Sequence, residues 1–383
     1  LKTGGYGRCT LAPFSDIDLM FLLPYKLTAH SEQVIEFILY LLWDLGLKVG
    51  HATRSIDEAI SLSRSDLTIR TSLLESRWLT GDKKLFAKFR AQFMNKLVSK
   101  TGPEFVEAKL AERDLRHTRM GDSRYVLEPN IKDGKGGLRD LQMLYWIVKY
   151  LYQVESPDDF YDRGILTKTD TNIFNKAERF FWTVRFHIHY ISGRAEERMA
   201  FHLQADISER MGYSSCRSIK GVEQFMKDYF LTAKNVGNLT MILCSILEEH
   251  HKKKQRRFQF PSFNSSGKVS IGYKIDGGRV RFSCQNPLKK NPSQMLGLFK
   301  EAQRLNCELH PSALRLVTQH LNIIDANFQN SKKNNSIFLD ILLGPVPDRA
   351  LMRLNDAGVF GRFVTQFGAV IAQMQYDMYH VYT

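Results

Sequence analysis

The stretch GGYGRCTLAPFSDIDLMFLL (Gly4–Leu23) carries two features that together decide the fold of the N-terminal part of the chain. Its second half, Ile17 to Leu23, is apolar except for Asp18 and is followed by Pro24, which predicts a buried β-strand. Side chains at positions i and i+2 of a strand share one face. Asp16 and Asp18 are therefore expected to point the same way at the start of this strand.

Two neighbouring carboxylates repel each other unless a cation lies between them. Mg²⁺ prefers oxygen ligands and is usually held by one or two carboxylates together with substrate phosphates. The glycines at positions 4 and 5 allow the backbone to approach a triphosphate closely. The combination predicts a metal-dependent nucleotidyl-transfer site, with Asp16 and Asp18 as catalytic metal ligands and Gly4 and Gly5 as nucleotide-binding residues.

The remainder of residues 1–100 alternates helix and strand patterns. Ser31 is expected to cap a helix that ends at Gly46, residues 47–53 to form a second strand, and Asp57 to cap a short helix through Leu62. A further apolar segment covers residues 71–79. The first helix has an apolar stripe at Val34, Ile35, Ile38, Leu41, Leu42 and Leu45. These elements predict a small α/β unit with a mixed sheet.

From about residue 103 to 250 the pattern is helical, with long periodic segments at 139–152, 170–192 and 219–247. The aromatic side chains of the second segment, Phe180, Phe181, Trp182, Phe186 and Tyr190, are expected in the core. Residues 269–282 have the pattern of a β-hairpin with its turn at 276–278. Helical patterns resume at about residue 293.

The segment NIKDGKGGLRD (Asn130–Asp140) places three glycines and two lysines directly before a helix. Successive backbone N–H groups at a helix N-terminus can bind an anion. One interpretation is therefore contact with the phosphates or the base of a nucleotide. The alternative is a flexible turn that leads into the helix. The spacing of a Walker A loop is absent.

The bulk composition narrows the class of protein. A length of 383 residues predicts two or three domains, and a hydrophobic content of 43% is enough for packed cores. No apolar run reaches the ~18 residues of a membrane span. Five scattered cysteines without metal-site spacing indicate a reducing cytoplasm. The chain begins with Leu close to the glycine motif, so we expect sequence upstream to be missing.

The net charge of +14 is spread along the chain rather than gathered, which makes nucleic acid an unlikely partner. The exception is the run HHKKKQRR (His250–Arg257), before a segment rich in Pro, Ser, Asn and Gly. It is interpreted as a solvated helix end and linker. An acidic partner or a phosphate surface is the alternative, and part of the excess charge would disappear if the missing segments are acidic.

Several motifs of the chain, taken together, resemble the bacterial bifunctional PII uridylyltransferase/uridylyl-removing enzymes, the GlnD family. The resemblance runs nearly from end to end. The motifs are GGYGR…SDIDL (4–19), LGLKVGHATRSIDEA (45–59), DLTIRTSLLESRWLTGD (66–82), PNIKDGKGGLRDLQ (129–142), GVEQFMKDYF (221–230), LNDAGVFGRF (354–363) and AQMQYDMYHVYT (372–383).

The resemblance implies an α+β fold. A DNA polymerase beta-like nucleotidyltransferase domain would occupy residues 1–100, and a mostly α-helical domain residues 101–257. A small β-hairpin insertion and helical linker would follow at 258–370. Residues 371–383 would begin an HD phosphohydrolase domain, which carries the uridylyl-removing activity. Its His-Asp motif and the two ACT domains that sense glutamine would lie outside this chain.

The resemblance also implies a reaction. UMP would pass from UTP to a tyrosine of the PII nitrogen-regulatory protein, with release of pyrophosphate. Asp16 and Asp18 would hold Mg²⁺, with Mn²⁺ as an alternative. A third carboxylate, Glu75 or else Asp66, would act as metal ligand or general base, although either side chain could instead form a helix cap or an ion pair. The predicted nucleotide contacts are Gly4, Gly5, Arg8, Ser15, Lys132, Lys135 and Arg139.

One departure from the family pattern concerns the glycine motif, where Cys9-Thr10 stand in place of the frequent Gly-Glu. Two other functions remain open from the residues. One is protein adenylyl transfer of the glutamine synthetase type, which uses the same Asp-x-Asp logic. The other is a catalytically silent regulatory module that binds nucleotide or PII.

Overall fold

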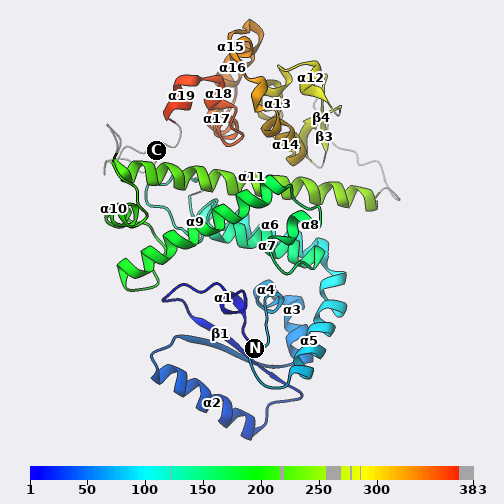
Figure 1. Cartoon of the computed structure of the whole chain (residues 1–383). Coiled ribbons are helices and arrows are strands. Elements are labelled where there is room, and N and C mark those ends of the chain that lie inside the picture. The colour runs from blue at the N-terminus through cyan, green and yellow to red at the C-terminus, as the bar shows by residue number, and fades with distance from the viewer. Residues whose placement is uncertain (122, 216–219, 256–268, 277, 285, 371–383) are drawn as a thin grey trace. The chain divides into compact units, whose positions relative to one another are not determined.

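The computed structural model describes residues 1–121, 123–215, 220–255, 269–276, 278–284 and 286–370. They form two compact units, of which the first is Leu1–Ala233 and the second begins at Lys234. Both units are mostly helical and contain small sheets (Figure 1). The expected domain boundaries at residues 100, 257 and 370 stay predictions. The expected start of an HD domain at 371–383 lies outside the described residues.

The first unit contains two main strands and a series of helices. In chain order its elements are α1 Gly4–Gly7, β1 Ile17–Leu23, α2 Ala29–Asp44, β2 Val49–Ser55, α3 Ile56–Ser65, α4 Leu67–Leu74, α5 Lys83–Lys96, the 3-10 helix η1 Val98–Lys100, α6 Gly102–Arg119, α7 Leu138–Tyr152, α8 Asp159–Asp162, α9 Lys168–Ser192 and α10 Phe201–Arg210. The long helix α11, Gly221–Gln255, runs from the first unit into the second.

Strands β1 and β2 pair in parallel, with Asp18 opposite Gly50 in the register. The predicted first strand is confirmed. Lys2 adds isolated antiparallel bridges to Leu19 and to Arg77, so the small sheet has a mixed character, as expected. The α1 turn, β1 and helix α4 come together at the N-terminal part of the chain (Figure 1).

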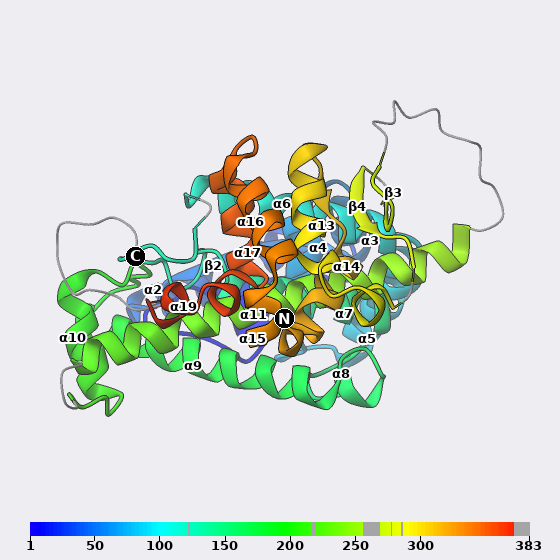
Figure 2. The same cartoon turned by 90° about the horizontal axis from the view of Figure 1, so that it is seen from above.

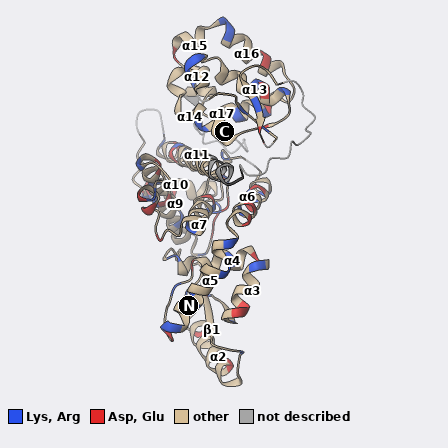
Figure 3. Ribbon diagram, turned by 90° about the vertical axis from the view of Figure 1, so that its right-hand side faces the viewer, with Lys and Arg blue, Asp and Glu red and all other residues tan. Residues whose placement is uncertain are grey.

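Helix α2 differs in detail from its prediction. It begins at Ala29, and its cap is Thr28, whose hydroxyl accepts the N–H of Ser31 at 3.3 Å. The apolar stripe is correct only in part, because the fully buried side chains are Ile35 and Leu39. The helix contains no Lys or Arg, and most of its surface in Figure 3 is uncharged. Its exposed apolar side chains are Val34, Phe37, Tyr40, Leu41 and Trp43.

The next two helices also correct the prediction. Helix α3 is capped by Ser55 rather than Asp57, through a capping box in which Ser55 and Glu58 each bind the other's backbone N–H. Helix α4 ends at Leu74, inside the predicted apolar segment 71–79. Glu75 therefore lies directly at the C-terminal end of a helix.

The three long predicted helices are confirmed as α7, α9 and α11. The rings of Phe105 in α6 and Tyr150 in α7 stack at a centroid distance of 3.9 Å, and the Tyr150 hydroxyl hydrogen-bonds Thr101 at 2.6 Å. In α9 the core expectation holds only on one face, since Phe181 and Trp182 are buried. Phe180 is half-buried, while Phe186 and Tyr190 are exposed, because five aromatic residues over eleven positions cannot share one face of a helix.

The second unit has its own hydrophobic core. Its elements are β3 Tyr273–Asp276, β4 Arg279–Phe282, α12 Pro287–Lys290, α13 Gln294–Arg304, β5 Glu308–Leu309, α14 Pro311–Gln319, η2 Leu321–Ile323, α15 Ala326–Asn330, α16 Lys332–Leu343, α17 Pro347–Asp356, α18 Phe360–Phe363 and α19 Thr365–Val370. The predicted hairpin is confirmed as the antiparallel pair β3–β4, and β5 adds a parallel strand. Helices α13, α16 and α17 pack together (Figure 2) around the buried Phe299, Ile341 and Leu354.

Two further points concern the chain as a whole. None of the helices in the described residues is both long enough and apolar enough to cross a membrane. The basic run His250–Arg257 lies outside the residues whose side chains are described, so its interpretation stays a prediction.

The stacked Phe105–Tyr150 pair supports a test of the first unit's core. Phe105 is 0% exposed, so Phe105→Ala should lower the free energy of unfolding by about 3–5 kcal/mol through lost burial and a residual cavity. Phe37 in α2 is 69% exposed, and Phe37→Ala should change stability by less than about 0.5 kcal/mol. Urea unfolding measures both. Equal losses would show that α6 and α7 do not form the core.

Candidate active site

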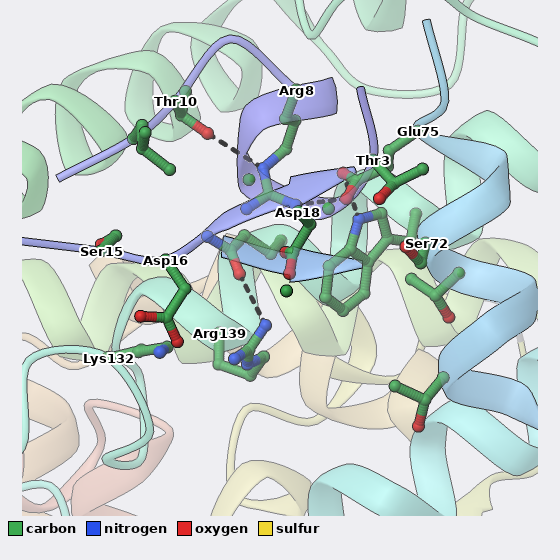
Figure 4. Close-up of a pocket in the computed structure, with 18 of the residues that line it drawn as sticks. Thr3, Arg8, Thr10, Ser15, Asp16, Asp18, Ser72, Glu75, Lys132 and Arg139 are labelled. Carbon is green, nitrogen blue, oxygen red and sulfur yellow. Dashed lines mark hydrogen bonds and ion pairs between the residues drawn. The ribbon is translucent and has the colours of Figure 1, made fainter. Parts of the chain in front are cut away.

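A cavity of the first unit, called the main cavity below, has a volume of about 1000 Å³. The α1 turn and the start of β1 line it together with Gly50 and His51 of β2 and the end of α4. The helices α6, α7 and α9 complete its wall. Figure 4 shows the carboxylates of Asp16 and Asp18 and the side chains of Lys132 and Arg139 directed into the same space. The structure thus brings together residues that are more than a hundred positions apart in the sequence.

Asp18 lies between two glycines. A Cβ on Gly4 would be 2.5 Å from Asp18 Oδ2, and a Cβ on Gly50 would be 2.9 Å from Asp18 Oδ1. Gly4 also has φ +54°, a conformation that glycine adopts without strain. The space beside both oxygens of this carboxylate therefore depends on the absence of two side chains. The β1–β2 register supplies the second glycine, which the sequence analysis did not identify.

The two aspartates interact electrostatically. Partial burial and the charge of Asp16 raise the pKa of Asp18, whereas Arg8 and Lys132 oppose this effect. Two neighbouring carboxylates beside space cleared by glycines form a donor set that suits Mg²⁺. Among the described residues no group of three or more His, Cys, Asp or Glu side chains is placed to hold a metal.

Both candidates for the predicted third carboxylate, Glu75 and Asp66, are engaged in contacts with other protein groups. Glu75 is 4% exposed and forms an ion pair with Arg8, while its Oε1 accepts the indole N–H of Trp146 at 2.5 Å. Asp66 caps α4 by accepting the N–H groups of Thr68 and Ile69. These contacts are the ion pair and the helix cap that the sequence had left open as alternatives. A role of Glu75 or Asp66 on the metal stays an untested prediction.

The glycine-rich segment 130–140 is a packed turn and not an open anion cradle. The side chain of Asn130 accepts the N–H groups of Lys132 and Asp133, and the N–H of Gly136 donates to Asp140 Oδ2 at 2.7 Å. The N–H groups of Gly134, Gly137, Leu138 and Arg139 bind carbonyl oxygens of the same segment. Most backbone donors of this segment are therefore already used, which leaves little of the expected anion cradle. Contact of the segment with a nucleotide stays an untested prediction.

Asp140 holds this turn in place. It is 2% exposed, forms an ion pair with Arg116 and lies 2.9 Å from His117 Nε2, both in α6. Although burial would raise the pKa of Asp140, the contacts with His117, Arg116 and the Gly136 N–H lower it below its ordinary range. The charged carboxylate therefore joins α6 to the turn before α7.

The three predicted cationic side chains of this segment line two different cavities. Lys132 and Arg139 line the main cavity, where Arg139 Nε lies 3.3 Å from Asp133 Oδ1 and Lys132 Nζ lies 3.7 Å from Glu197 Oε1. Lys135 lines a separate cavity of about 250 Å³. The structure thus brings Lys132 and Arg139, but not Lys135, into the cavity that holds the aspartate pair.

The other predicted nucleotide contacts all line the main cavity. Arg8 donates from Nε to Thr10 Oγ1 at 3.1 Å in addition to its pairing with Glu75. The Ser15 hydroxyl accepts from Arg185 Nη2 at 3.4 Å. A Cβ on Gly5 would be 3.0 Å from the Thr10 carbonyl oxygen, so this glycine permits a tight loop. Their roles as nucleotide ligands stay predictions.

Several further residues of the cavity wall were not predicted from the sequence, among them Lys109, Trp146, Arg185 and Glu197. Each lies on a helical segment or after one, without a local motif. Trp146 occupies a core position of the α7 pattern, and the charged residues look like ordinary surface positions. No signal in a single sequence would have distinguished them, because only the packing of α6, α7 and α9 against the β1 loop brings them together.

Gly50 gives a test of the space around Asp18. Gly50→Ala places a methyl group against Asp18 Oδ1, so we expect Mn²⁺, used as a probe for Mg²⁺, to bind at least about 10-fold more weakly. Gly46→Ala is the matched control, because Gly46 has open space around it but φ +76°. It should lower stability by about 1 kcal/mol and leave Mn²⁺ binding unchanged. Calorimetric titration checks both variants, and equal Mn²⁺ affinities would contradict the arrangement.

Glu197 gives a prediction about pH. Burial alone would raise the pKa of Glu197, but His189, Arg185 and Lys132 lower it from 4.5 to about 2. A carboxyl with a depressed pKa stabilises the folded state above about pH 4.5 and loses that contribution as pH falls toward 2. Wild type should therefore be more stable than Glu197→Gln at pH 7, by at most about 3 kcal/mol before solvent screening.

The difference between these two proteins should shrink between pH 4.5 and pH 2, as measured by urea unfolding at several pH values. Glu209, an exposed residue of α10, gives the matched control Glu209→Gln, for which no pH-dependent difference is expected. A difference for Glu197→Gln that stays constant down to pH 2 would contradict the assignment of this half-buried carboxyl as an ion-pair partner.

Comparison with known proteins agrees with the sequence resemblance. Residues 104–244 match the family described as GlnD PII-uridylyltransferase, and residues 273–363 match the uridylyltransferase GlnD third domain. Proteins called bifunctional uridylyltransferase/uridylyl-removing enzyme from Azospirillum brasilense, Rhodospirillum rubrum and a Bradyrhizobium species are 52%, 50% and 46% identical to the chain. No solved structure was found to match it.

These similarities cover 100% of this chain but only 41–42% of the length of those three relatives. They span residues 16–18, which precede the first matched family segment. The chain therefore belongs to the GlnD family, as the portion that carries its PII-uridylyltransferase domain and its third domain.

Proposed function

We propose that this chain carries the site for magnesium-dependent transfer of UMP from UTP to a tyrosine of a PII protein. The observation that supports the proposal most is the pair Asp16 and Asp18, with space cleared by Gly4 and Gly50, at the wall of a cavity of about 1000 Å³. The name of the relatives supplies uridylyl transfer as the reaction.

In the proposed reaction the tyrosine oxygen of PII bonds to the α-phosphorus of UTP. The bond from this phosphorus to the oxygen bridging the α- and β-phosphates breaks, and pyrophosphate leaves with the electron pair. The hydroxyl proton is lost to solvent or to a nearby base. The products are uridylylated tyrosine and pyrophosphate.

Asp16 and Asp18 would hold Mg²⁺ or Mn²⁺ as its two protein carboxylates. When bound, the metal supplies positive charge that lowers the pKa of the attacking hydroxyl and stabilises the charge that develops on the phosphates. The raised pKa of Asp18 fits this role, because two adjacent carboxylates gain most from a cation that both can share.

The neighbouring cations are proposed to orient the nucleotide. Arg8, Lys132 and Arg139 line the same cavity and would contact phosphate oxygens. Glu75 would act through Arg8, since its buried ion pair fixes the direction of the guanidinium. Gly4 and Gly5 would let the backbone of the α1 turn approach the phosphates, and Ser15 would donate a further hydrogen bond.

Mutation of the aspartate pair tests the function. Asp16→Asn and Asp18→Asn should each reduce UMP transfer to purified PII by at least ~100-fold, because an amide cannot supply the charge that the metal needs. The assay uses the full-length protein, Mg²⁺ and each of the four nucleoside triphosphates labelled at the α-phosphate. Circular dichroism and urea unfolding should show that both variants are folded.

Asp66→Asn is the matched control, since asparagine caps a helix as well as aspartate does. It should keep its activity, and a loss comparable to that of Asp18→Asn would make Asp66 the third metal ligand. Labelling from ATP alone would replace the proposal by adenylyl transfer. Nucleotide binding without labelling of PII would leave a silent regulatory module.

A further inference from the structure

The indole of Trp146 in α7 is surrounded by three cations. The Lys109 ammonium of α6 lies 4.8 Å from a ring centroid of Trp146, and the guanidinium carbons of Arg8 and Arg139 lie 5.7 Å away. Trp146 is 5% exposed, and its N–H is used by Glu75. The three cations come from the α1 turn, α6 and α7, and all of them line the main cavity.

These cations differ in how firmly they are paired. Arg8 is held by the buried Glu75, and Arg139 by Asp133 and by the Gln142 side chain at 3.1 Å. Lys109 has a side chain only 3% exposed, yet its carboxylate partner, Glu112 at 2.9 Å, is 45% exposed. A carboxylate that is nearly half exposed contributes less to an ion pair than a buried one, because water screens its charge. The Lys109 ammonium is therefore buried without a strong counter-charge.

Such burial has a measurable electrostatic consequence. Desolvation lowers the pKa of Lys109, the nearby charge of Arg139 adds to this effect, and Glu112 and Glu75 oppose it. An ammonium has three donors, of which Glu112 accepts one and the indole face attracts another. Lys109 thus keeps donor capacity at a cavity wall, in surroundings that an incoming anion would improve.

The number of converging cations indicates the kind of anion. A neutral nucleobase offers single carbonyl oxygens, which one donor satisfies. The tail of a nucleoside triphosphate carries several negative charges over neighbouring oxygens, which three cations can share. Trp146 holds these cations at one place despite their mutual repulsion, because its π-face attracts each of them.

We propose that Lys109, held on the face of Trp146, binds the β- and γ-phosphates of the nucleotide and the pyrophosphate that leaves, together with Arg8 and Arg139. This inference rests on the function proposed above and adds two residues, Lys109 and Trp146, to its site. In free protein Glu112 occupies the ammonium, and the polyphosphate replaces it there.

Binding of inorganic tripolyphosphate to the full-length protein tests this role without any transfer reaction. Lys109→Met should weaken tripolyphosphate binding by about 10-fold or more and leave UMP affinity within twofold. The matched control is Lys149→Met. Lys149 also lies on a helix of this unit, 5.4 Å from the Tyr145 ring and 3.3 Å from Glu155, but it lines a different cavity. It should bind tripolyphosphate like the wild type.

A second substitution acts in the opposite direction. Glu112→Gln frees the Lys109 ammonium and should strengthen tripolyphosphate binding by a fewfold. The gain should disappear in the double variant Lys109→Met/Glu112→Gln, because the two residues act on the phosphate through one contact. A gain of equal size in the double variant would mean that Glu112 acts only as a general negative charge, and would overturn the role of Lys109.

Two further outcomes would also overturn the proposal. One is unchanged tripolyphosphate affinity in Lys109→Met. The other is lost discrimination between UTP and CTP with unchanged tripolyphosphate affinity, which would mean that Lys109 recognises the base.

The inference and the proposed function can fail separately. Failure of PII labelling together with the expected tripolyphosphate results would contradict only the proposed function. Normal labelling with a wild-type KM for UTP in Lys109→Met would remove only this inference.

Discussion

The buried carboxylate of Glu75 is the contact on which the site depends. It lies at the end of α4, pairs with Arg8 after the α1 turn and accepts the indole N–H of Trp146 in α7. One side chain thus joins the strand-bearing part of the chain to its helical part. A buried charge is stable only when its partners are in place, so these three segments have one arrangement that satisfies it. The backbone is equally close there, because a Cβ on Gly7 would be 2.4 Å from the Glu75 carbonyl oxygen.

A second buried carboxylate, that of Asp140, likewise joins segments that lie apart in the sequence. Asp140 binds Arg116 and His117 of α6 and the N–H of Gly136. Because it holds the glycine-rich turn tightly, the side chains of that turn, and not its backbone, remain for a ligand. Lys132 and Arg139 leave the turn toward the aspartate pair, and Lys135 lines the separate smaller cavity.

The charged side chains around the cavity differ in how firmly they are paired. Glu75 and Asp140 neutralise the cations that position the segments, and they are almost fully buried. Lys109 also lines the cavity, but its partner Glu112 is 45% exposed and therefore weaker. Partial burial and the charge of Asp16 raise the pKa of Asp18 in the same cavity. In the proposed function, the metal and the phosphates of a nucleotide would supply the opposite charges at both places.

The sequence by itself determined the local features. Strand β1 follows from an apolar run that ends at proline, the aspartates share a face because of the two-residue period of a strand, and the long helices follow from their 3.6-residue period. The same residues carried the resemblance to the GlnD family. These features depend on neighbours within a few positions, so one sequence is enough to predict them.

Only the tertiary structure decided what these elements place around Asp18. It put Gly50 opposite Asp18, paired Glu75 with Arg8 and Trp146, used most N–H groups of the glycine-rich turn and brought Lys109 to the cavity. Each of these outcomes depends on contacts between segments far apart in the chain. The sequence does not show whether a carboxylate or a lysine faces water or a buried partner. Its surroundings in the folded protein set its charge and its role.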